Sequence, residues 1–555
     1  MAQPNDTINK EQTQKRILMA TVLSFAFFIA YDFLYLQPKQ ELVNQANAQN
    51  AITTQNQSVE KTVANNAPSV NSNTAPVSDI NTVSTISPKS VSSSDVIATV
   101  ETLKNTIEID NLGRIYQVTL KDKQYTSEDG ARIKLFNLNQ LKPLEVRFAD
   151  RKINEEAFNV AVVSSVTTLD AKSKTNELIL TQTLSNTTLR KIIKFYPDGH
   201  YDIQVTSTNN ADFFITTGTR PDVLADMYAS HGALLSLNDD TLNIIEDEDM
   251  DKTLEFTGVN VTSAFDRYYA SVLYNYDTSM IVSVMKDSND SPQLFIHGKN
   301  NISLHGYMGP KEHKTLSTLD PRLTSVIEYG WFTFIAQPMF TLLQFMHDYI
   351  GNWGWTIIFV TILIKLVLFP LSHKGMVSMN RLKELSPKVK AIQEKYKNDK
   401  QKASMHMMEL YKKEGANPMG GCLPIILQIP VFFAIYRVLL NSIELKGAPW
   451  ILWVEDLGVM DPYFILPILM GATMFLQQKI TPNTMADPMQ QKIFQLLPVV
   501  FTFFFLWFPA GLTLYWFINN LFTIAQQYYV NTIFKNARIA RHEKHEEEKS
   551  SHNKK

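Results

Sequence analysis

The chain has little of what most enzymes need. Cys422 is the single cysteine among 555 residues, which excludes an internal disulfide framework and any site that binds a metal through several cysteines. The sequence contains no Walker-type glycine loop, no G-x-S-x-G nucleophile motif and no H-E-x-x-H zinc motif. We therefore expect no catalytic residue, no metal and no cofactor, and we expect Cys422 to be a buried structural thiol.

Charged residues are scarce in several long apolar segments, and a transmembrane helix needs about 20 mostly apolar residues. The first such segment, residues 17–36, follows a polar stretch, residues 1–16, that ends in Lys15-Arg16. Because no small-residue cleavage site follows closely, we expect an uncleaved anchor whose N-terminus is cytoplasmic. Residues 37–95 are rich in Asn, Gln, Ser and Thr and poor in aromatics, which predicts a flexible linker.

Residues 96–325 show the period of two that is typical of strands. Segments such as TIEIDNLGRIYQVTL and NELILTQTL alternate apolar with polar residues, and turn residues separate them. The segment KIIKFYPDGHYDIQV predicts a β-hairpin with its turn at residues 197–199. The pattern favours a large antiparallel β-sandwich, which lies outside the cytoplasm if the anchor before it has its N-terminus inside. Asp266 and His305 are candidates for a sugar-handling cleft, but scattered surface charge is the better interpretation because no spacing marks a site.

A second apolar region begins at residues 328–350, where a Gln-Pro pair interrupts the run and favours an interfacial amphipathic helix. Residues 353–371 have the length of a membrane span and contain Lys365, with Thr361 one turn earlier on the same face. A charge at the centre of a membrane helix costs roughly 2.5–3.5 kcal/mol on insertion scales. Such a side chain faces a polar partner or cavity, or extends to the headgroups, and position alone leaves both interpretations of Lys365 open.

Residues 373–418 carry eleven Lys or Arg against five Asp or Glu. Apolar residues recur at every third or fourth position, which predicts a helical hairpin on the cytoplasmic side. Such a basic, methionine-rich hairpin suits a docking surface for partner proteins, anionic lipid or RNA phosphates, and a solvated loop is the alternative. The tail, residues 531–555, is also basic. The side chains that we expect to dock partners are Arg381, Lys383, Lys388 and Lys390.

Four further apolar segments are residues 422–440, 462–478, 493–508 and 512–530. The loops between them alternate between acidic and basic as the positive-inside rule requires. The fold class is therefore an α+β membrane protein with six transmembrane helices and both termini in the cytoplasm: the anchor plus a five-helix core over residues 353–530. Polar side chains inside these spans either form hydrogen bonds between helices or line a hydrated groove together with Lys365. The ones that we expect beside Lys365 are Thr361, Gln428, Asn519 and Asn520.

Six motifs in the second half of the chain are distinctive: YGWFTFIAQPMF (329–340), GNWGW (351–355), NPMGGCLPIILQIPVFFAIY (417–436), DPYFILPILMGATMF (461–475), DPMQQK (487–492) and LWFPAGLTLYW (506–516). They resemble the YidC family of bacterial membrane protein insertases. The long exported domain and the N-terminal anchor are similar to the Gram-negative form of that family. The resemblance covers residues 326–530 densely.

This resemblance implies a hydrophilic groove within five core helices, open to the cytoplasm and to lipid, with a positively charged residue inside it. By position that residue is Lys365, where family members usually carry arginine; lysine keeps the charge but loses the planar fork of donors. The resemblance also implies that the exported domain is a supersandwich similar to sugar mutarotases. The positions that it implies for substrate contact are Leu427, Phe433, Tyr515 and Trp516.

We therefore expect a membrane protein insertase and chaperone of the cell inner membrane rather than an enzyme. Its expected partners are nascent membrane proteins and the phospholipid bilayer. The resemblance adds the Sec translocon as a partner, because the family works either alone or together with it. It also adds the ribosome and targeting factors, which contact the cytoplasmic hairpin and tail. One rival is a secondary transporter, which needs coupling-ion sites and often inverted repeats. The other is a membrane-anchored carbohydrate-active enzyme, which needs clustered carboxylates in the β domain.

Overall fold

The structure is a computed structural model, and it describes residues 95–126, 130–138, 140–221, 223, 230–250, 252–415, 423–481 and 488–552. These residues belong to one compact unit, Val70–Lys555. The predicted anchor (17–36), nearly all of the predicted linker (37–95) and Cys422 lie outside the described residues.

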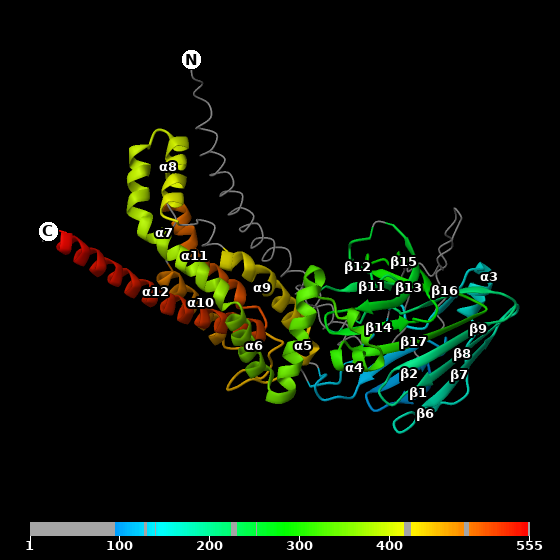
Figure 1. The fold of residues 1–555 in the computed structure, drawn as a ribbon. Coiled ribbons are helices and arrows are strands. Elements are labelled where there is room, and N and C mark those ends of the chain that lie inside the picture. The colour runs from blue at the N-terminus through cyan, green and yellow to red at the C-terminus, as the bar shows by residue number, and fades with distance from the viewer. Residues whose placement is uncertain are drawn as a thin grey trace, which may run out of the picture. The chain divides into compact units, whose positions relative to one another are not determined.

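The first half of the described chain forms two β-sheets (Figure 1). The smaller sheet has the order β3 (Ile115–Leu120), β2 (Asn105–Asp110), β1 (Val96–Glu101) and β6 (Thr168–Asp170). The larger sheet follows the order β4 (Val146–Phe148), β10 (Asp212–Thr216), β16 (Pro292–Lys299), β15 (Met280–Lys286), β13 (Leu254–Phe265), β14 (Tyr269–Tyr274), β17 (Asn301–Pro310), β9 (Tyr201–Ser207), β8 (Thr188–Phe195), β7 (Asn176–Thr183) and β5 (Val163–Ser164). Beside this path, β11 (Gly232–Leu237) pairs with β12 (Leu242–Glu246) and β13.

The predicted hairpin at residues 197–199 is confirmed, because β8 and β9 pair antiparallel with Phe195 opposite Tyr201. Gly199 has a φ of +93°, a conformation that glycine adopts without steric cost. The expectation of a purely antiparallel β region is wrong at one place, since β1 pairs with β6 in parallel. Parallel neighbours need a long crossover, and here the chain between them runs through β2, β3, β4 and β5.

Strand β14 is buried on both faces, unlike a strand with one solvated side. Tyr269 and Leu273 join the core between the sheets, whereas Ala270, Val272 and Tyr274 join a second core that continues into the helices. This arrangement explains why β14 has no polar alternation, because both rows of its side chains pack against apolar neighbours. The short helix α3 (Arg151–Ala157) follows β4, and Asp150 caps its first turn.

Short helices connect the β domain to the helical part: α4 (His313–Leu319), η2 (Pro321–Val326) and η3 (Gly330–Phe332). Helix α5 (Thr333–Ile350) then begins later than the expected boundary at residue 328. Glu328 is instead part of the connection, where its Oε2 atom lies 3.6 Å from the Nη1 atom of Arg437. Helix α5 buries Phe340 and exposes Phe334 and Tyr349, as an amphipathic helix does.

The segment predicted as one helix over residues 353–371 is broken. Helix α6 (Trp353–Val367) ends just before Leu368, and α7 (Phe369–Lys395) continues at an angle of 64°. Pro370 is the physical reason, since its ring collides with the carbonyl four residues earlier and it has no N–H to donate. Among the described residues this bent pair reaches the length and apolarity of a membrane span, whereas no helix reaches both alone.

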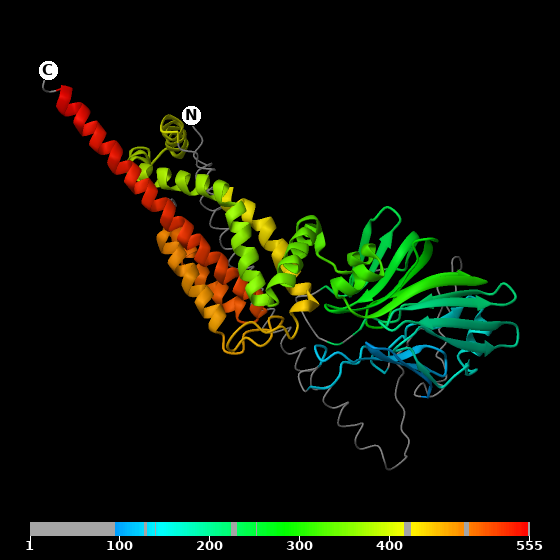
Figure 2. The same ribbon diagram turned by 60° about the horizontal axis from the view of Figure 1, so that its bottom comes forward.

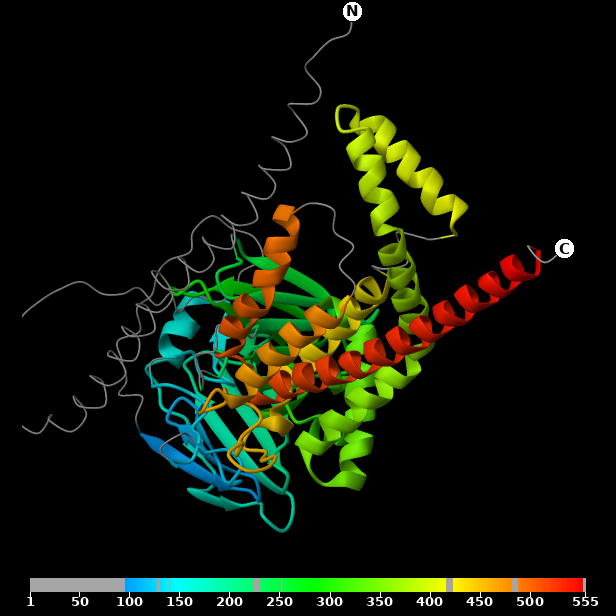
Figure 3. The same cartoon turned by 90° about the vertical axis from the view of Figure 1, so that its left-hand side faces the viewer.

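The predicted hairpin region contains α7 and α8 (Lys400–Lys413), which pack against each other (Figure 3). The later helices are α9 (Leu423–Asn441), η5 (Ile443–Leu445), α10 (Ile465–Ile480), α11 (Pro488–Phe505) and α12 (Ala510–His552). Helices α10, α11 and α12 lie side by side (Figure 2). Helix α12 includes both the predicted last span and most of the predicted tail, so no break separates the two at residue 530.

Candidate functional site

Lys365 lies on α6, whose start is fixed against the loop that follows η5. Asn352 caps the helix, because its side-chain oxygen accepts a hydrogen bond from the backbone N–H of Trp355 at 3.1 Å. Its side-chain nitrogen donates to the carbonyl of Pro449 at 3.0 Å. Gly354 is required at this contact, since a Cβ atom there would lie 2.1 Å from the indole of Trp450. These contacts set the rotation of α6 and therefore the direction in which Lys365 points.

The side chain of Lys365 contacts polar groups on two other helices. Its Nζ atom donates to the hydroxyl oxygen of Thr523 on α12 at 2.9 Å and to the Oε1 atom of Gln428 on α9 at 3.4 Å. Gln428 in turn donates through Nε2 to the Oδ1 atom of Asn519 at 2.9 Å. The Thr523 hydroxyl closes the ring by donating to the backbone carbonyl of Asn519 at 2.7 Å. We call these four residues the Lys365 polar cluster.

The Lys365 polar cluster is enclosed and holds its cation with uncharged groups. Lys365 is 7% exposed, and both of its side-chain acceptors are neutral. An ammonium group has three N–H donors, so among the described residues one of them has no acceptor. A cation with a spare donor in such a place attracts an anionic or carbonyl oxygen.

Two of the residues expected beside Lys365 point elsewhere. The hydroxyl of Thr361 donates to the carbonyl of Ile357 in its own helix at 2.6 Å. Asn520 faces α10, where its side-chain nitrogen lies 3.4 Å from the hydroxyl oxygen of Thr473. Asn519 and Asn520 are one residue apart on a helix, which is a rotation of about 100°, so both cannot face α6 and α9.

Thr523 is the member of the cluster that the sequence did not single out. A signal was present, because Thr523 lies four residues after Asn519 and therefore on the same face of α12. A threonine hydroxyl in a helix commonly bonds to the carbonyl four residues earlier, as this one does, so the side chain alone gave no reason to expect a contact with Lys365.

The apolar positions expected to contact substrate do not form one surface. Tyr515 is buried, and Trp516 is half-buried with its ring 4.5 Å from that of Phe432. Phe433 is 44% exposed, and its ring stacks on Phe332. The side chain of Leu427 lies outside the described residues.

The four basic residues expected to dock partners are all exposed on α7, and Lys388 pairs with Glu414 at 2.7 Å. The remaining members of this set are Arg381, Lys383 and Lys390. Most of the positive charge of this helix is therefore available at the surface.

Comparison with known proteins decides the family. Residues 345–537 match the family model described as the 60Kd inner membrane protein, and residues 98–342 match that of the YidC periplasmic domain. The membrane protein insertase YidC of Campylobacter jejuni is 52% identical over 523 residues, which covers 94% of this chain and 96% of that protein. The chain belongs to the YidC family.

Two further YidC proteins are similar over nearly the whole chain. Those of Wolinella succinogenes and Helicobacter pylori are 46% and 43% identical; each match covers 95% of this chain, and 96% and 98% of the respective relative. Within the YidC family match, the Lys365 polar cluster lies in the inner membrane protein region, and the two sheets lie in the periplasmic domain.

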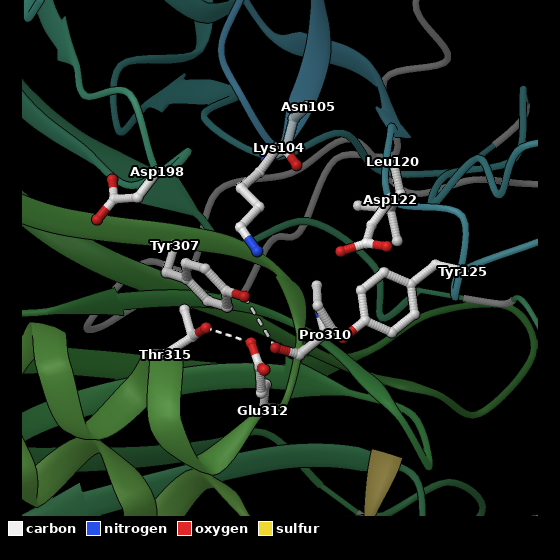
Figure 4. Close-up of a pocket in the computed structure, with 10 residues that line it drawn as sticks. All are labelled: Lys104, Asn105, Leu120, Asp122, Tyr125, Asp198, Tyr307, Pro310, Glu312 and Thr315. Atoms are coloured by element: carbon white, nitrogen blue, oxygen red, sulfur yellow. Dashed lines mark hydrogen bonds between the residues drawn. The ribbon is translucent and has the colours of Figure 1, made fainter. Parts of the chain in front are cut away.

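The YidC periplasmic domain contains a cavity of about 50 Å³, which has room for a few water molecules (Figure 4). Lys104 extends into it, and three carboxylates surround it: Asp122, Asp198 and Glu312. Each carboxylate already accepts a hydrogen bond within its own local segment, from the backbone N–H of Gln124, from His200 and from the hydroxyl of Thr315, respectively. These three carboxylates therefore stabilise local turns around the cavity, and their arrangement does not favour a pair of catalytic acids.

The two residues considered for a sugar-handling cleft do not line this cavity. Asp266 is buried and accepts hydrogen bonds from the backbone N–H groups of Tyr268 and Tyr269, at 2.8 and 2.6 Å. His305 lies on β17, where its Nδ1 atom is 2.6 Å from Asp202. Asp266 shapes a turn and His305 makes a surface hydrogen bond with Asp202, so neither favours the carbohydrate-enzyme alternative.

Proposed function

We propose that this chain is a membrane protein insertase and chaperone of the inner membrane, which acts on nascent membrane proteins without hydrolysing a nucleotide. Family membership supports the activity. The observation that carries the proposal for the site is Lys365, a buried cation held by uncharged side chains from two other helices. In this proposal Lys365 is the residue that contacts the substrate, and the other three members of the Lys365 polar cluster hold its side chain in position.

The physical obstacle to insertion is the polar part of the substrate. Unpaired peptide groups cost several kcal/mol each in hydrocarbon, so a polar flank cannot cross without partners. The spare N–H of Lys365 offers a charged donor to a carboxylate or carbonyl of that flank. Once the flank has crossed, the apolar segment that follows enters the lipid spontaneously.

Access to Lys365 requires the cluster to open. The contact from Lys365 to Gln428 is the longer of its two, at 3.4 Å, whereas the one to Thr523 is 2.9 Å. We infer that α9 separates from α12 and that substrate groups replace Gln428, which forms a hydrated groove beside α6. Phe433, exposed on α9, then contacts the apolar segment, with Trp516, Tyr515 and Leu427 reached as the groove widens.

The proposed topology has six spans with both termini in the cytoplasm: residues 17–36 and helices α6, α9, α10, α11 and α12. The loop charges described above support it. Exposed basic side chains on α7 would receive ribosomes and targeting factors, and the Sec translocon would be a further partner. Charge reversal at Arg381, Lys383 and Lys390 tests this docking role, and unchanged cosedimentation with ribosomes would contradict it.

The central test is insertion into proteoliposomes that contain the purified full-length chain. The substrate is a single-span protein with an acidic polar flank, and no nucleotide is added. We expect Lys365→Met to reduce insertion at least tenfold, whereas Lys365→Arg retains it because the charge remains. Lys479→Met is the matched control, since Lys479 is exposed on α10 with its Nζ atom over the ring of Phe475.

Insertion by Lys365→Met at the rate of the unmodified chain would remove the cation from the mechanism. Loss of insertion in Lys479→Met as well would show that the effect of the substitution is not specific to Lys365. A solute-flux assay on the same proteoliposomes distinguishes the insertase from a secondary transporter, which moves a solute in the absence of substrate protein.

A further inference from the structure

Gln526 on α12 is a buried side chain whose polar atoms have no partner in the part of the chain that the structure describes. Its side chain is 4% exposed, and neither its Nε2 nor its Oε1 atom has a hydrogen-bond partner among the described residues. Leaving a buried amide unpaired is costly, and most native proteins avoid it. The next residue, Gln527, is 2% exposed but donates to the Oδ1 atom of Asn531 at 2.7 Å. The two neighbouring glutamines thus have the same side chain and similar burial, but among the described residues only Gln527 has a hydrogen-bond partner.

Gln526 continues the face of α12 that carries the Lys365 polar cluster. It lies three residues after Thr523 and seven after Asn519, so the three stack along one side of the helix. One turn beyond it, the ring of Tyr529 lies 6.3 Å from that of Phe369, the first residue of α7. Gln526 is therefore at the level where α6 and α7 meet at 64°.

Polar groups continue along α12 beyond this level. The Oδ1 atom of Asn531 accepts a hydrogen bond from Asn380 of α7 at 2.9 Å. Along α12 there are thus three polar levels: Thr523 with Lys365, Gln526, and Asn531 with Asn380. The first and last are paired between helices, whereas Gln526 has no partner among the residues that the structure describes.

We propose that Gln526 binds the main chain of the substrate's polar flank on its way between the α7 end of the bundle and Lys365. A carboxamide presents one carbonyl acceptor and an NH₂ donor, which together match the N–H and C=O of a peptide group. Recognition of this kind is independent of side-chain identity, which suits an insertase with varied substrates. The inference rests on the proposed function and adds a substrate-binding residue to it.

The first experiment compares Gln526→Met with Gln527→Met in the full-length chain, since methionine has nearly the same length and no donor. We expect Gln526→Met to keep or raise the Tm, because a buried unpaired amide is removed, and to slow insertion about 2- to 10-fold, the equivalent of one net hydrogen bond. Gln527→Met should lower the Tm, because the Oδ1 atom of Asn531 loses one of its two donors and keeps only Asn380, without slowing insertion beyond its loss of folded protein. Insertion by Gln526→Met at the unmodified rate would overturn the proposal.

The second experiment separates a peptide group from water as the occupant. Synthetic single-span peptides are offered to the proteoliposomes with and without N-methylation of the peptide bonds in the polar flank. Methylation removes backbone N–H donors, which lowers the cost of dehydration and by itself speeds passage. If Gln526 binds the main chain, methylation removes a contact in the unmodified chain alone, so the ratio of the methylated to the unmethylated insertion rate is lower in the unmodified chain than in Gln526→Met, as a double-mutant cycle requires.

An equal ratio in the two chains, or a higher ratio in the unmodified chain than in Gln526→Met, would overturn the assignment and favour water. These outcomes are distinct from failure of the proposed function itself. In that case the unmodified chain would not insert the unmethylated peptide at all.

Discussion

The Nζ atom of Lys365 lies 2.9 Å from the hydroxyl oxygen of Thr523, although 158 residues separate them in the chain. The same hydroxyl donates to the carbonyl of Asn519, so it uses its proton within α12 and its lone pair for the cation. This contact joins α6 to α12 by polar groups, in addition to the apolar core that contains residues of both helices. It is the geometric basis of the candidate site.

Thr523→Val tests the strength of this contact, because valine has almost the same shape and no acceptor. We expect a loss of roughly 1–3 kcal/mol in the free energy of unfolding, since a buried ammonium loses its closest partner. Thr361→Val is the control: Thr361 is 2% exposed whereas Thr523 is half-buried, and among the described residues the Thr361 hydroxyl bonds only within its own helix. Thermal unfolding in detergent measures both, and equal small shifts would mean that the Thr523 contact contributes nothing.

Gly471→Ala should destabilise the packing of α10 against α11. A Cβ atom at residue 471 would lie 1.9 Å from the hydroxyl oxygen of Thr502, so one helix must move. Overpacking of this kind costs typically about 1–3 kcal/mol. Adding Thr502→Ala should restore much of the loss, because it removes the colliding oxygen. A purely additive double variant in thermal unfolding would show that the two residues do not meet.

Glu444→Gln should change how stability depends on pH. Glu444 lies in η5, beyond the end of α9, and accepts a hydrogen bond from the backbone N–H of His313 at 2.9 Å. Burial is the main cause that raises its pKa from 4.5 to about 7. The folded chain therefore holds this proton more tightly than the unfolded chain, so its contribution is complete below about pH 4.5 and is lost as the pH rises to about 7.

The measurement is the free energy of unfolding of both chains between pH 4 and 8. Relative to Glu444→Gln, the unmodified chain should lose stability on the order of 1–2 kcal/mol as the pH rises, a value reduced for the partial exposure of the carboxyl. Parallel curves for the two chains would show that Glu444 titrates normally.

Local patterns in the sequence predicted local structure well. The turn at residues 197–199 is a short-range signal, because its proline and glycine fix the backbone whatever surrounds them. Alternation also identified the strands as a class. It did not give their pairing, and the parallel contact of β1 with β6 depends on a crossover that no short segment encodes.

The candidate site was predictable only in part. An ionisable residue in an apolar helix pointed to Lys365, and Gln428 and Asn519 indeed lie beside it. Asn520 and Thr361 do not, because the rotation of each helix is set by distant contacts such as Gly354 with Trp450. The proline that divides α6 from α7 was visible in the sequence, but membrane helices tolerate proline, so the break was not expected.

Helix α12 runs unbroken from Ala510 to His552, and Thr523 lies in its first third. At 1.5 Å per residue, roughly 40 Å of rigid rod connects Thr523 with the far end of the helix. A partner bound to the basic tail can therefore act on the candidate site from a distance. Force applied at the far end of α12 is transmitted along the helix to Thr523, whose hydroxyl oxygen accepts a hydrogen bond from Lys365.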